Sequence, residues 1–387
     1  MAKRIRIGIN FTHDENWIGG TYYITNLVSS LKTLPDNHKP QIIVLTWNES
    51  DYDMIRQTGY PHLAYQNFFI PLNPVQRLVN KASGIISDKN VINKVLSDKQ
   101  VDVVFPCYTS KHFEKVSGKI FWIPDFQEIY YPNFFSAEQI ENRKRTQKAI
   151  IDSASRIIFS SNNAIADFQK LYPNAKNKTH VLNFAVTHPE FSSLESNSLK
   201  EKYQITQKYF LVPNQFWIHK NQTIVLKALA KLKDRKDFLV VFTGKESDVR
   251  NPDYLNSLKK IVSDNSLHDI VRFLGFIERR DQLKLMSESL AVIQPSLFEG
   301  WSTVVEDAKA MNKFILLSDL AVHHEQVTDN CTFFNPNNES TLASAMKNIL
   351  SNGVVTKGKK DYSENIINFA NDFMKIINRE LSQCLNS

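Results

Sequence analysis

Short apolar runs alternate with longer amphipathic segments along the whole chain. The apolar runs of the first half read RIRIGIN, QIIVLT, VDVVFP, KIFWIP, SRIIFSS and HVLNFA, and those of the second half read YFLVPN, FLVVFTG, IVRFLGF, LAVIQPS, FILLSD and CTFFNP. Between them, apolar residues recur at helical spacing over residues 20–33, 137–153, 221–233, 279–289 and 302–312. Strands that alternate with helices in this way predict βαβ units, and therefore parallel sheets in an α/β protein.

The two sets of strands predict two domains. Each half of the 387-residue chain carries enough strands for one doubly wound sheet. The segment between them, THPEFSSLESNSLKEKYQITQK, is polar and poor in strands, which places the boundary near residues 188–207. We expect Rossmann-like domains over residues 1–190 and 205–360 that face a central cleft. Residues 361–387 are expected to form a last helix, over about 361–385, that packs back across the domains.

Composition and charge narrow the class of protein. No apolar run reaches the roughly 18 residues that a transmembrane helix needs, and Met1 leads into a strand-like pattern without a signal peptide. The three cysteines lie far apart, so neither a disulfide framework nor a Cys-x-x-Cys metal site is predicted. We therefore expect a cytoplasmic protein. The net charge of +7 is concentrated in residues 1–190, which suits an acidic partner such as anionic lipid, a phosphorylated ligand or nucleic acid, although many domains are moderately basic without one.

The stretch QPSLFEGWSTVVEDAKAMNK, residues 294–313, places three acids around the start of one predicted helix. Thr303 and Glu306 fit a capping box, in which the hydroxyl caps an amide of the first turn and the carboxylate reaches back. Asp307 lies about 100° further round the helix and faces elsewhere. Glu299 precedes the helix at the carboxyl end of a strand, where ligands bind in α/β sheets. The pattern therefore favours a structural role for Glu306 and ligand contacts for the other two acids.

The same helix start predicts an anion site. Gly300 turns the chain, and the amides of Trp301, Ser302 and Thr303 lie in the first turn, where intrahelical partners are lacking and the helix dipole favours negative charge. An anion cradle flanked by carboxylates that bind hydroxyls suits a phosphorylated sugar or a nucleotide sugar.

The stretch PSLFEGWSTVVEDAKA resembles the acidic signature of family-4 retaining glycosyltransferases of GT-B fold, in which two acids are separated by seven residues. The resemblance sets Glu299 on the first acid, which contacts hydroxyls of the donor sugar, and Asp307 on the second, which holds the nucleotide ribose. The family usually carries Glu at the second position, so Glu306 remains a substitute for the ribose contact. The resemblance implies two Rossmann-like domains and a UDP-, GDP- or ADP-linked sugar as donor substrate, with no further cofactor.

The resemblance extends over most of the chain. NFTHDENWIGGTYYITNL is similar to the family's glycine loop beneath the donor phosphates, with Gly19 and Gly20 in that place. LVPNQFWIHKNQTIVLKAL resembles the first strand and helix of the donor domain, where an Arg and a Lys bind the diphosphate. Lys220 matches the Lys, whereas Gln215 stands where the Arg is usual. Other candidates on this side are Asn214, His219 and Asn221, together with Gly244 at the end of the next strand.

Two further segments resemble parts of the family's cleft. VRFLGFIERRDQL is similar to the segment whose backbone lines the base pocket, here around Gly275 and Ile277. FWIPDFQEIYYPNFFS is similar to the inter-domain segment in which relatives often carry His-Asp facing the donor. The pair here is Pro124-Asp125, so the role of the histidine is vacant. Asp125 and Glu128 are candidates for contacts with the acceptor or the sugar.

The predicted function is a retaining, metal-independent transfer of a sugar from a nucleotide-diphosphate sugar to a saccharide or lipid-linked saccharide acceptor. Lys220 and the helix amides stabilise the departing diphosphate in this interpretation, and Glu299 holds the hydroxyls of an oxocarbenium-like sugar. Asp51 and Asp53 resemble an Asp-x-Asp metal motif, but they follow a loop-like segment and are interpreted as solvated, so no metal is predicted. Nucleic acid is not an expected partner.

Two other classes remain open. One is a non-catalytic nucleotide-sugar-binding or scaffold protein of the same fold, because the usual Arg and His are missing. The other is a nucleotide-cofactor oxidoreductase, although no Gly-x-Gly-x-x-Gly follows the first strand.

Residues 75–99 raise the question of a membrane partner. Apolar residues recur there at near-helical spacing, and Lys and Arg outnumber Asp. One interpretation is a core helix pair with a solvated basic face. The other is a surface that meets anionic lipid and brings a peripheral enzyme to a lipid-linked acceptor at the inner face of the membrane.

Overall fold

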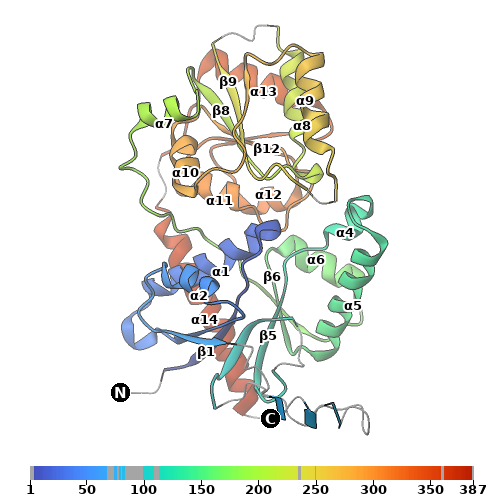
Figure 1. Ribbon diagram of the computed structural model, residues 1–387, viewed down its shortest axis with the longest axis vertical. Helices are drawn as coiled ribbons and strands as arrows, with labels where there is room; N and C mark the ends of the chain where they lie inside the picture. Colours follow the sequence, from blue (N-terminus) through green and yellow to red (C-terminus); the bar gives the residue numbers. More distant parts are fainter. Residues whose placement is uncertain are drawn as a thin grey trace.

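The computed structural model describes residues 4–67, 74–75, 78–79, 81–82, 99–108, 113–233, 237–248, 250–358 and 361–385. These residues form two lobes, each built around a parallel sheet with helices packed around it (Figure 1). The predicted α/β class, with two doubly wound sheets, is confirmed.

The first sheet has seven strands in the order β3-β2-β1-β4-β5-β6-β7, and all of its pairings are parallel. Its strands are β1 (Arg6–Asn10), β2 (Gln41–Thr46), β3 (Leu63–Asn67), β4 (Val103–Cys107), β5 (Gly118–Ile123), β6 (Arg156–Phe159) and β7 (Lys178–Val181). The sequence predicts six of them and misses β3. That strand lies at the sheet edge with Tyr65 37% exposed, so it does not need the apolar run that marks the other strands.

The second sheet has six parallel strands in the order β10-β9-β8-β11-β12-β13. These are β8 (Tyr209–Pro213), β9 (Leu239–Thr243), β10 (Val271–Phe273), β11 (Val292–Gln294), β12 (Ile315–Ser318) and β13 (Cys331–Phe334), and the sequence predicts all of them. In both sheets the first strand of the domain lies between the second and the fourth. The order of the strands therefore reverses at this first strand. Such a reversal is a switch point, where a crevice opens at the carboxyl ends of the strands.

The helices of the first domain and the linker are α1 (Ile18–Ser30), α2 (Glu49–Arg56), α4 (Gln127–Tyr130), α5 (Ala137–Ser153), α6 (Asn162–Leu171) and α7 (Ser196–Lys202). Those that follow are α8 (Gln222–Lys231), α9 (Tyr254–Asp264), α10 (Arg279–Glu288), α11 (Thr303–Ala310), α12 (Ala321–Gln326), α13 (Glu339–Asn352) and α14 (Ser363–Leu385). The prediction for α5 agrees at both ends, because Ser136 and Gln139 form a capping box that fixes its start.

Helix α2 corrects one interpretation. Asp51 does not lie solvated in a loop, because it is 5% exposed within α2 and its Oδ2 accepts a hydrogen bond from Thr46 Oγ1 at 3.0 Å. Asp53 pairs with Arg56 one turn further along the helix.

The last helix completes the core of the first domain. Phe369, Ala370 and Phe373 of α14 are buried in one apolar cluster with residues of the first sheet and α1, including Ile7 and Tyr23. Figure 1 shows α14, in red, running beneath the blue and cyan strands of the first lobe. Burial of each of the two Phe side chains contributes roughly 1.5–3 kcal/mol, so this helix is a substantial part of the stability of the first domain. No helix among the described residues combines the length and apolarity needed to cross a membrane.

Candidate active site

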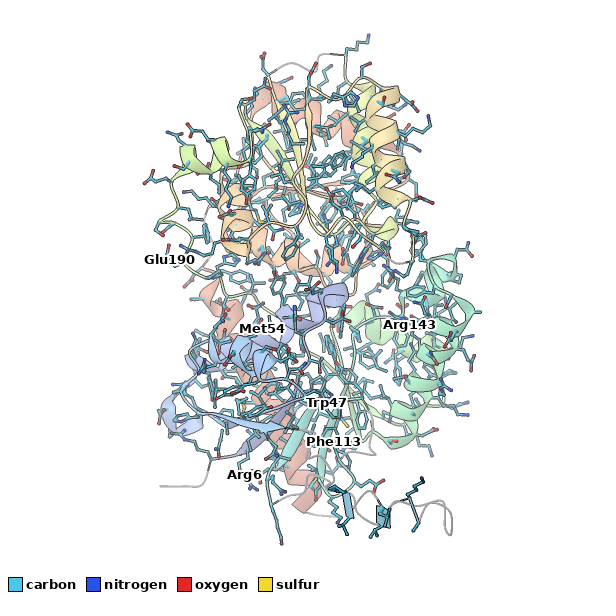
Figure 2. The ribbon with its side chains drawn as sticks, viewed as in Figure 1. Arg6, Trp47, Met54, Phe113, Arg143 and Glu190 are labelled. Carbon is cyan, nitrogen blue, oxygen red and sulfur yellow. The ribbon has the colours of Figure 1, made fainter. Side chains whose placement is uncertain are left out.

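A cavity of about 590 Å³ lies between the two domains. The residues that line it follow the carboxyl ends of strands, the edge at which α/β sheets bind ligands: Asp125 after β5, Asn214 after β8, Gly244 after β9 and Glu299 after β11. We call its two sides the first-domain wall and the second-domain wall. Figure 2 shows Arg143 of α5, part of the first-domain wall, in the region of the first lobe that approaches the second.

Most of the predicted site residues meet in this cavity. Those that line it are Gly19, Asp125, Asn214, Gln215, Lys220, Gly244, Ile277, Glu299, Gly300, Trp301, Ser302, Thr303 and Asp307. His219 lines it too. Five predicted residues do not line it, namely Gly20, Glu128, Asn221, Gly275 and Glu306.

Lys220 and Glu299 form the central ion pair of the second-domain wall. Lys220 Nζ lies 2.7 Å from Glu299 Oε1, and the two side chains are 16% and 8% exposed. The same oxygen accepts hydrogen bonds from Gln294 Nε2 at 2.7 Å and Ser296 Oγ at 2.6 Å. Asn221, in the left-handed conformation with φ 55°, turns the chain from Lys220 into α8. The carboxylate is therefore fixed in one orientation and its charge is balanced.

The start of α11 differs from the prediction in two ways. Its N-cap is Ser302, whose Oγ accepts a hydrogen bond from Val305 N at 3.4 Å, so Thr303 does not cap the helix. The amide of Ser302 donates to Gln326 Oε1 at 3.1 Å and is not available to an anion. The predicted cradle of three amides is therefore wrong for Ser302.

Glu306 is neither a capping acid nor a cleft residue. Its Oε1 accepts hydrogen bonds from Lys309 Nζ at 2.8 Å and Gln326 Nε2 at 2.9 Å, and its Oε2 accepts one from Tyr362 Oη at 2.5 Å. It is 1% exposed. Because Tyr362 directly precedes α14, Glu306 links α11 to α14. It therefore cannot substitute for Asp307 in the cleft.

Asp307 is the acid of α11 that reaches the cleft. Its Oδ1 accepts hydrogen bonds from Arg279 Nη2 at 2.5 Å and His188 Nε2 at 2.9 Å. Burial favours the neutral acid, but the Arg279 charge and the bond from His188 outweigh it, so the pKa of Asp307 lies below its ordinary value. Its buried Oδ2 has no partner within the protein. An ionised carboxylate with one unpartnered oxygen at the cavity is suited to accept a hydrogen bond from a hydroxyl group.

Arg250 is a further cation of the second-domain wall, beside Lys220 and Arg279, and it is not among the residues predicted from the sequence. Gln215, where an Arg was expected, donates from Nε2 to the backbone oxygen of Glu15 at 3.3 Å. Arg250, in the loop after β9, lines the cavity with its guanidinium 5.0 Å from the Trp217 ring centroid. Arg250 forms an ion pair with Asp248, with 3.0 Å between Arg250 Nε and Asp248 Oδ1. Arg250 lies 35 positions beyond Gln215 in the sequence, so no local motif indicates it.

Two glycines permit close approach of backbone at the cavity. A Cβ atom on Gly244, which has φ 144°, would lie 2.2 Å from Asn214 O. A Cβ atom on Gly300 would lie 2.8 Å from Pro124 O, so this glycine lets the two walls meet. Gly275 accepts a backbone hydrogen bond from Gly244 N at 2.8 Å and supports the wall from behind.

The two acids predicted on the first domain have different surroundings. Asp125 lines the cavity, and its burial raises its pKa above the ordinary value against the opposing charge of Arg143. Glu128 faces inward, where it accepts hydrogen bonds from Gln147 Nε2 at 2.6 Å and Arg143 Nη1 at 3.2 Å. The prediction of a ligand contact for Glu128 is therefore wrong, because α4 turns its side chain into the core.

Comparison with solved structures identifies the fold. A glycosyltransferase from Rickettsia africae ESF-5 superposes with a TM-score of 0.66 at 16% identity, over 99% of this chain and 99% of that one. The Anabaena protein Alr3699/HepE, in complex with UDP, superposes with a TM-score of 0.61 at 15% identity, over 99% of each chain. A sucrose-phosphate synthase from Thermosynechococcus elongatus gives 0.62 at 14% identity, over 99% of this chain and 98% of that one. The fold is GT-B, as predicted.

Sequence comparison gives matches over part of the chain. Residues 195–369 match the family described as glycosyl transferases group 1. The O-antigen chain mannosyltransferase RfbU of Salmonella typhimurium is 26% identical over 243 residues, which are 63% of this chain and 64% of RfbU. The match thus spans just under two thirds of that relative. Both matches agree with the predicted resemblance to glycosyltransferases of GT-B fold.

Proposed function

We propose that this protein transfers a sugar, with retention and without a metal ion, from a nucleotide-diphosphate sugar to a saccharide or lipid-linked saccharide. The observation that carries the proposal is the Lys220–Glu299 pair at 2.7 Å on the wall of the inter-domain cavity. RfbU, a mannosyltransferase of O-antigen chains, and HepE, solved with UDP and glucose, support a saccharide substrate and a nucleotide-sugar donor.

The ion pair suits the charges of this reaction. A free carboxylate beside the donor diphosphate would repel it, but Lys220 balances Glu299 while its remaining N–H groups stay available to phosphate oxygens. Arg250 supplies a second positive charge at the same cavity. Both cations stabilise the leaving diphosphate electrostatically, which is the task that a metal ion performs in other transferases.

The transfer itself balances without a covalent enzyme intermediate. The bond from the anomeric carbon to the phosphate oxygen breaks, and an acceptor oxygen bonds that carbon from the same face. The acceptor proton passes to the departing phosphate. Glu299 accepts hydrogen bonds from sugar hydroxyls, which strengthen as the sugar becomes oxocarbenium-like. Asp307 accepts a ribose hydroxyl at its unpartnered Oδ2.

The direct test uses purified protein with UDP-glucose, GDP-mannose and ADP-glucose. We expect one nucleotide class to raise the melting temperature, since about 100 Kd of ligand stabilises the folded state by about 2.7 kcal/mol. The same donor should be hydrolysed slowly without an acceptor, and EDTA should leave the rate unchanged. Binding without hydrolysis or transfer indicates the scaffold alternative, and an absorbance change with nicotinamide cofactors indicates the oxidoreductase.

Stereochemistry needs its own measurement. NMR of the first-formed product should show the anomeric configuration of the donor. An inverted product contradicts the retaining mechanism while leaving the transfer itself intact.

We further propose that this cytoplasmic enzyme meets an anionic membrane through residues 75–99. Most of that segment lies outside the described residues, but Val75, Leu78 and Val79 are 69%, 71% and 40% exposed. Exposed apolar side chains among Lys and Arg are typical of interfacial binding. Co-sedimentation with anionic vesicles should be strong at low salt and fall at high salt. Failure to bind at low salt contradicts this part of the proposal.

A further inference from the structure

Trp17 is a large aromatic residue that is left open at the cavity. It ends the short turn Glu15–Trp17 and precedes α1. It lines the cavity and is 41% exposed, whereas Trp122 beside it is 4% exposed. Full burial of a large apolar side chain contributes roughly 1.5–3 kcal/mol, so an indole left open in a concave site forgoes stability that a ligand can recover.

The indole of Trp17 is held in position by stacking. Its ring stacks on Trp122, with centroids 5.5 Å apart and an interplanar angle of 24°. Trp122 stacks in turn on Tyr23, with centroids 4.2 Å apart, and donates from Nε1 to Ser160 Oγ at 3.2 Å. The three rings form a ladder from the buried core to the cavity. The exposed ring is therefore held in place before any ligand binds.

Gly20 belongs to the same arrangement. A Cβ atom there would lie 2.7 Å from Trp17 Cε3 and Cζ3, closer than any real contact. The bare Cα of Gly20 is what lets the indole lie against α1. This accounts for a glycine that does not itself line the cavity.

Polar side chains line the cavity on the same domain as Trp17. Asp14, Asp125, Gln139 and Asn142 line the cavity from the same domain. Carboxylates and amides bind hydroxyls in pairs, and the negative face of an indole attracts the weakly positive C–H groups on one face of a sugar ring. The Lys220–Glu299 pair lies on the opposite domain. Arg143 also lines the cavity on this domain, but it is paired with Glu128 at 3.2 Å and lies 4.0 Å from Asp125. A ring beside hydroxyl-binding groups, across from the Lys220–Glu299 pair, is complementary to a neutral sugar ring.

We infer that Trp17 is the stacking platform for a pyranose ring of the acceptor saccharide, and that the neighbouring carboxylates and amides bind its hydroxyls. The inference rests on the proposed function and gives the acceptor a chemical class. The acceptor end that enters the cavity is a neutral sugar ring rather than a lipid diphosphate.

The test compares acceptor kinetics with donor binding. Methyl and octyl glycosides of mannose, glucose, galactose, rhamnose and N-acetylglucosamine serve as acceptors for the full-length protein. With the best of them, Trp17→Ala should lower kcat/KM by about tenfold or more through acceptor KM, a change equivalent to about 1.4 kcal/mol. Trp17→Phe should recover part of the loss, because a smaller ring still stacks. The Kd for nucleotide diphosphate and the rate of donor hydrolysis should stay unchanged.

Two further variants make the test specific. Trp47 is also an exposed tryptophan, 44% exposed, and does not line the cavity, so Trp47→Ala should leave acceptor KM unchanged. Gly20→Ala displaces the indole of Trp17 because the new Cβ atom would clash with it. Gly20 does not itself line the cavity, so this variant should raise acceptor KM as Trp17→Ala does, through the position of the ring.

The outcomes separate this inference from the proposed function. An unchanged acceptor KM in Trp17→Ala overturns the platform, and so does weakened nucleotide binding, which would assign the ring to the donor. A wild-type protein that hydrolyses donor but accepts none of the glycosides overturns the neutral-sugar class. A wild-type protein that binds no nucleotide sugar contradicts the proposed function instead.

Discussion

The two walls of the cavity are built from similar sheets but present different chemistry. The second-domain wall carries charged groups held by partners, namely Lys220 with Glu299 at 2.7 Å and Arg279 with Asp307. The first-domain wall carries stacked rings, Asp125, a carboxyl whose pKa is raised by burial, and Arg143, which is paired with Glu128. Repetition of one strand order therefore fixes where the walls meet but not what they bind.

The difference shows how a cleft can hold two unlike ligands. Paired charges that already have partners need no reorganisation when a charged transition state forms. Rings give contact area without charge and tolerate a neutral substrate. If this division is correct, substitutions on the second-domain wall change turnover and nucleotide binding, and substitutions on the first-domain wall change the acceptor.

The largest effect should come from Glu299→Gln. The substitution keeps the size and one acceptor oxygen but removes the charge that stabilises an oxocarbenium-like sugar. Turnover should fall by roughly a hundredfold or more, the scale for loss of one preorganised electrostatic contact. Steady-state kinetics at saturating donor measure it. The same change at Glu339, at the start of the distant helix α13, is the control, and a Glu299→Gln enzyme with full turnover contradicts the site assignment.

Removal of a cation should weaken the diphosphate contact next. Lys220→Ala is expected to raise the Kd for UDP or GDP by roughly tenfold to a hundredfold, as hydrogen bonds to charged groups contribute about 1.5–3 kcal/mol. Binding of the corresponding nucleoside should not change. Calorimetry with both ligands measures the difference, and Lys227→Ala on the exposed side of α8 is the matched control. Equal losses for nucleotide and nucleoside place the phosphate site elsewhere.

The neighbouring acids of α11 should separate stability from binding. Asp307→Asn should raise donor KM by roughly tenfold, with about 1.4 kcal/mol lost from the ribose contact. Glu306→Gln should leave donor KM unchanged and lower the free energy of unfolding by about 1–3 kcal/mol, because the amide N–H group of Gln must face either Tyr362 or the two donors Gln326 and Lys309. Denaturation and donor kinetics on both variants give the comparison. The opposite pattern exchanges their roles.

The smallest effect concerns pH. The folded-state pKa of Asp125 is raised, so its contribution to stability is present at acid pH and is lost as pH rises from about 3.9, the unfolded value, through the folded value. The pKa of Asp307 is lowered, so its contribution is present above about 3.9 and is lost as pH falls through its folded value. Asp125→Asn should therefore be slightly more stable than wild type at neutral pH. Melting temperatures between pH 3 and 7 test this, and equal slopes for the two proteins contradict it.

The sequence predicts the architecture because apolar strands and helical spacing recur in both halves, and only the half-exposed edge strand β3 lacks that pattern. It also predicts which acids flank α11. It fails where side chains far apart in sequence decide the outcome. Glu306 fits a capping box by its spacing from Thr303, yet its carboxylate accepts a hydrogen bond from Tyr362, 56 positions away in the sequence. Arg250 and Trp17 enter the cavity through loop geometry, for which no residue spacing is diagnostic.

The position of α14 has a consequence for how the protein is made. The chain emerges from the ribosome with its first domain lacking the helix that covers Ile7, Tyr23 and Phe105, because that helix ends at Leu385. Domains usually fold as units in the order of synthesis. Here the second domain can close its sheet before α14 is synthesised, whereas the first must wait for residues 363–385, which follow the whole second sheet. A nascent chain stalled before α14 should therefore expose an apolar face of the older domain to chaperones.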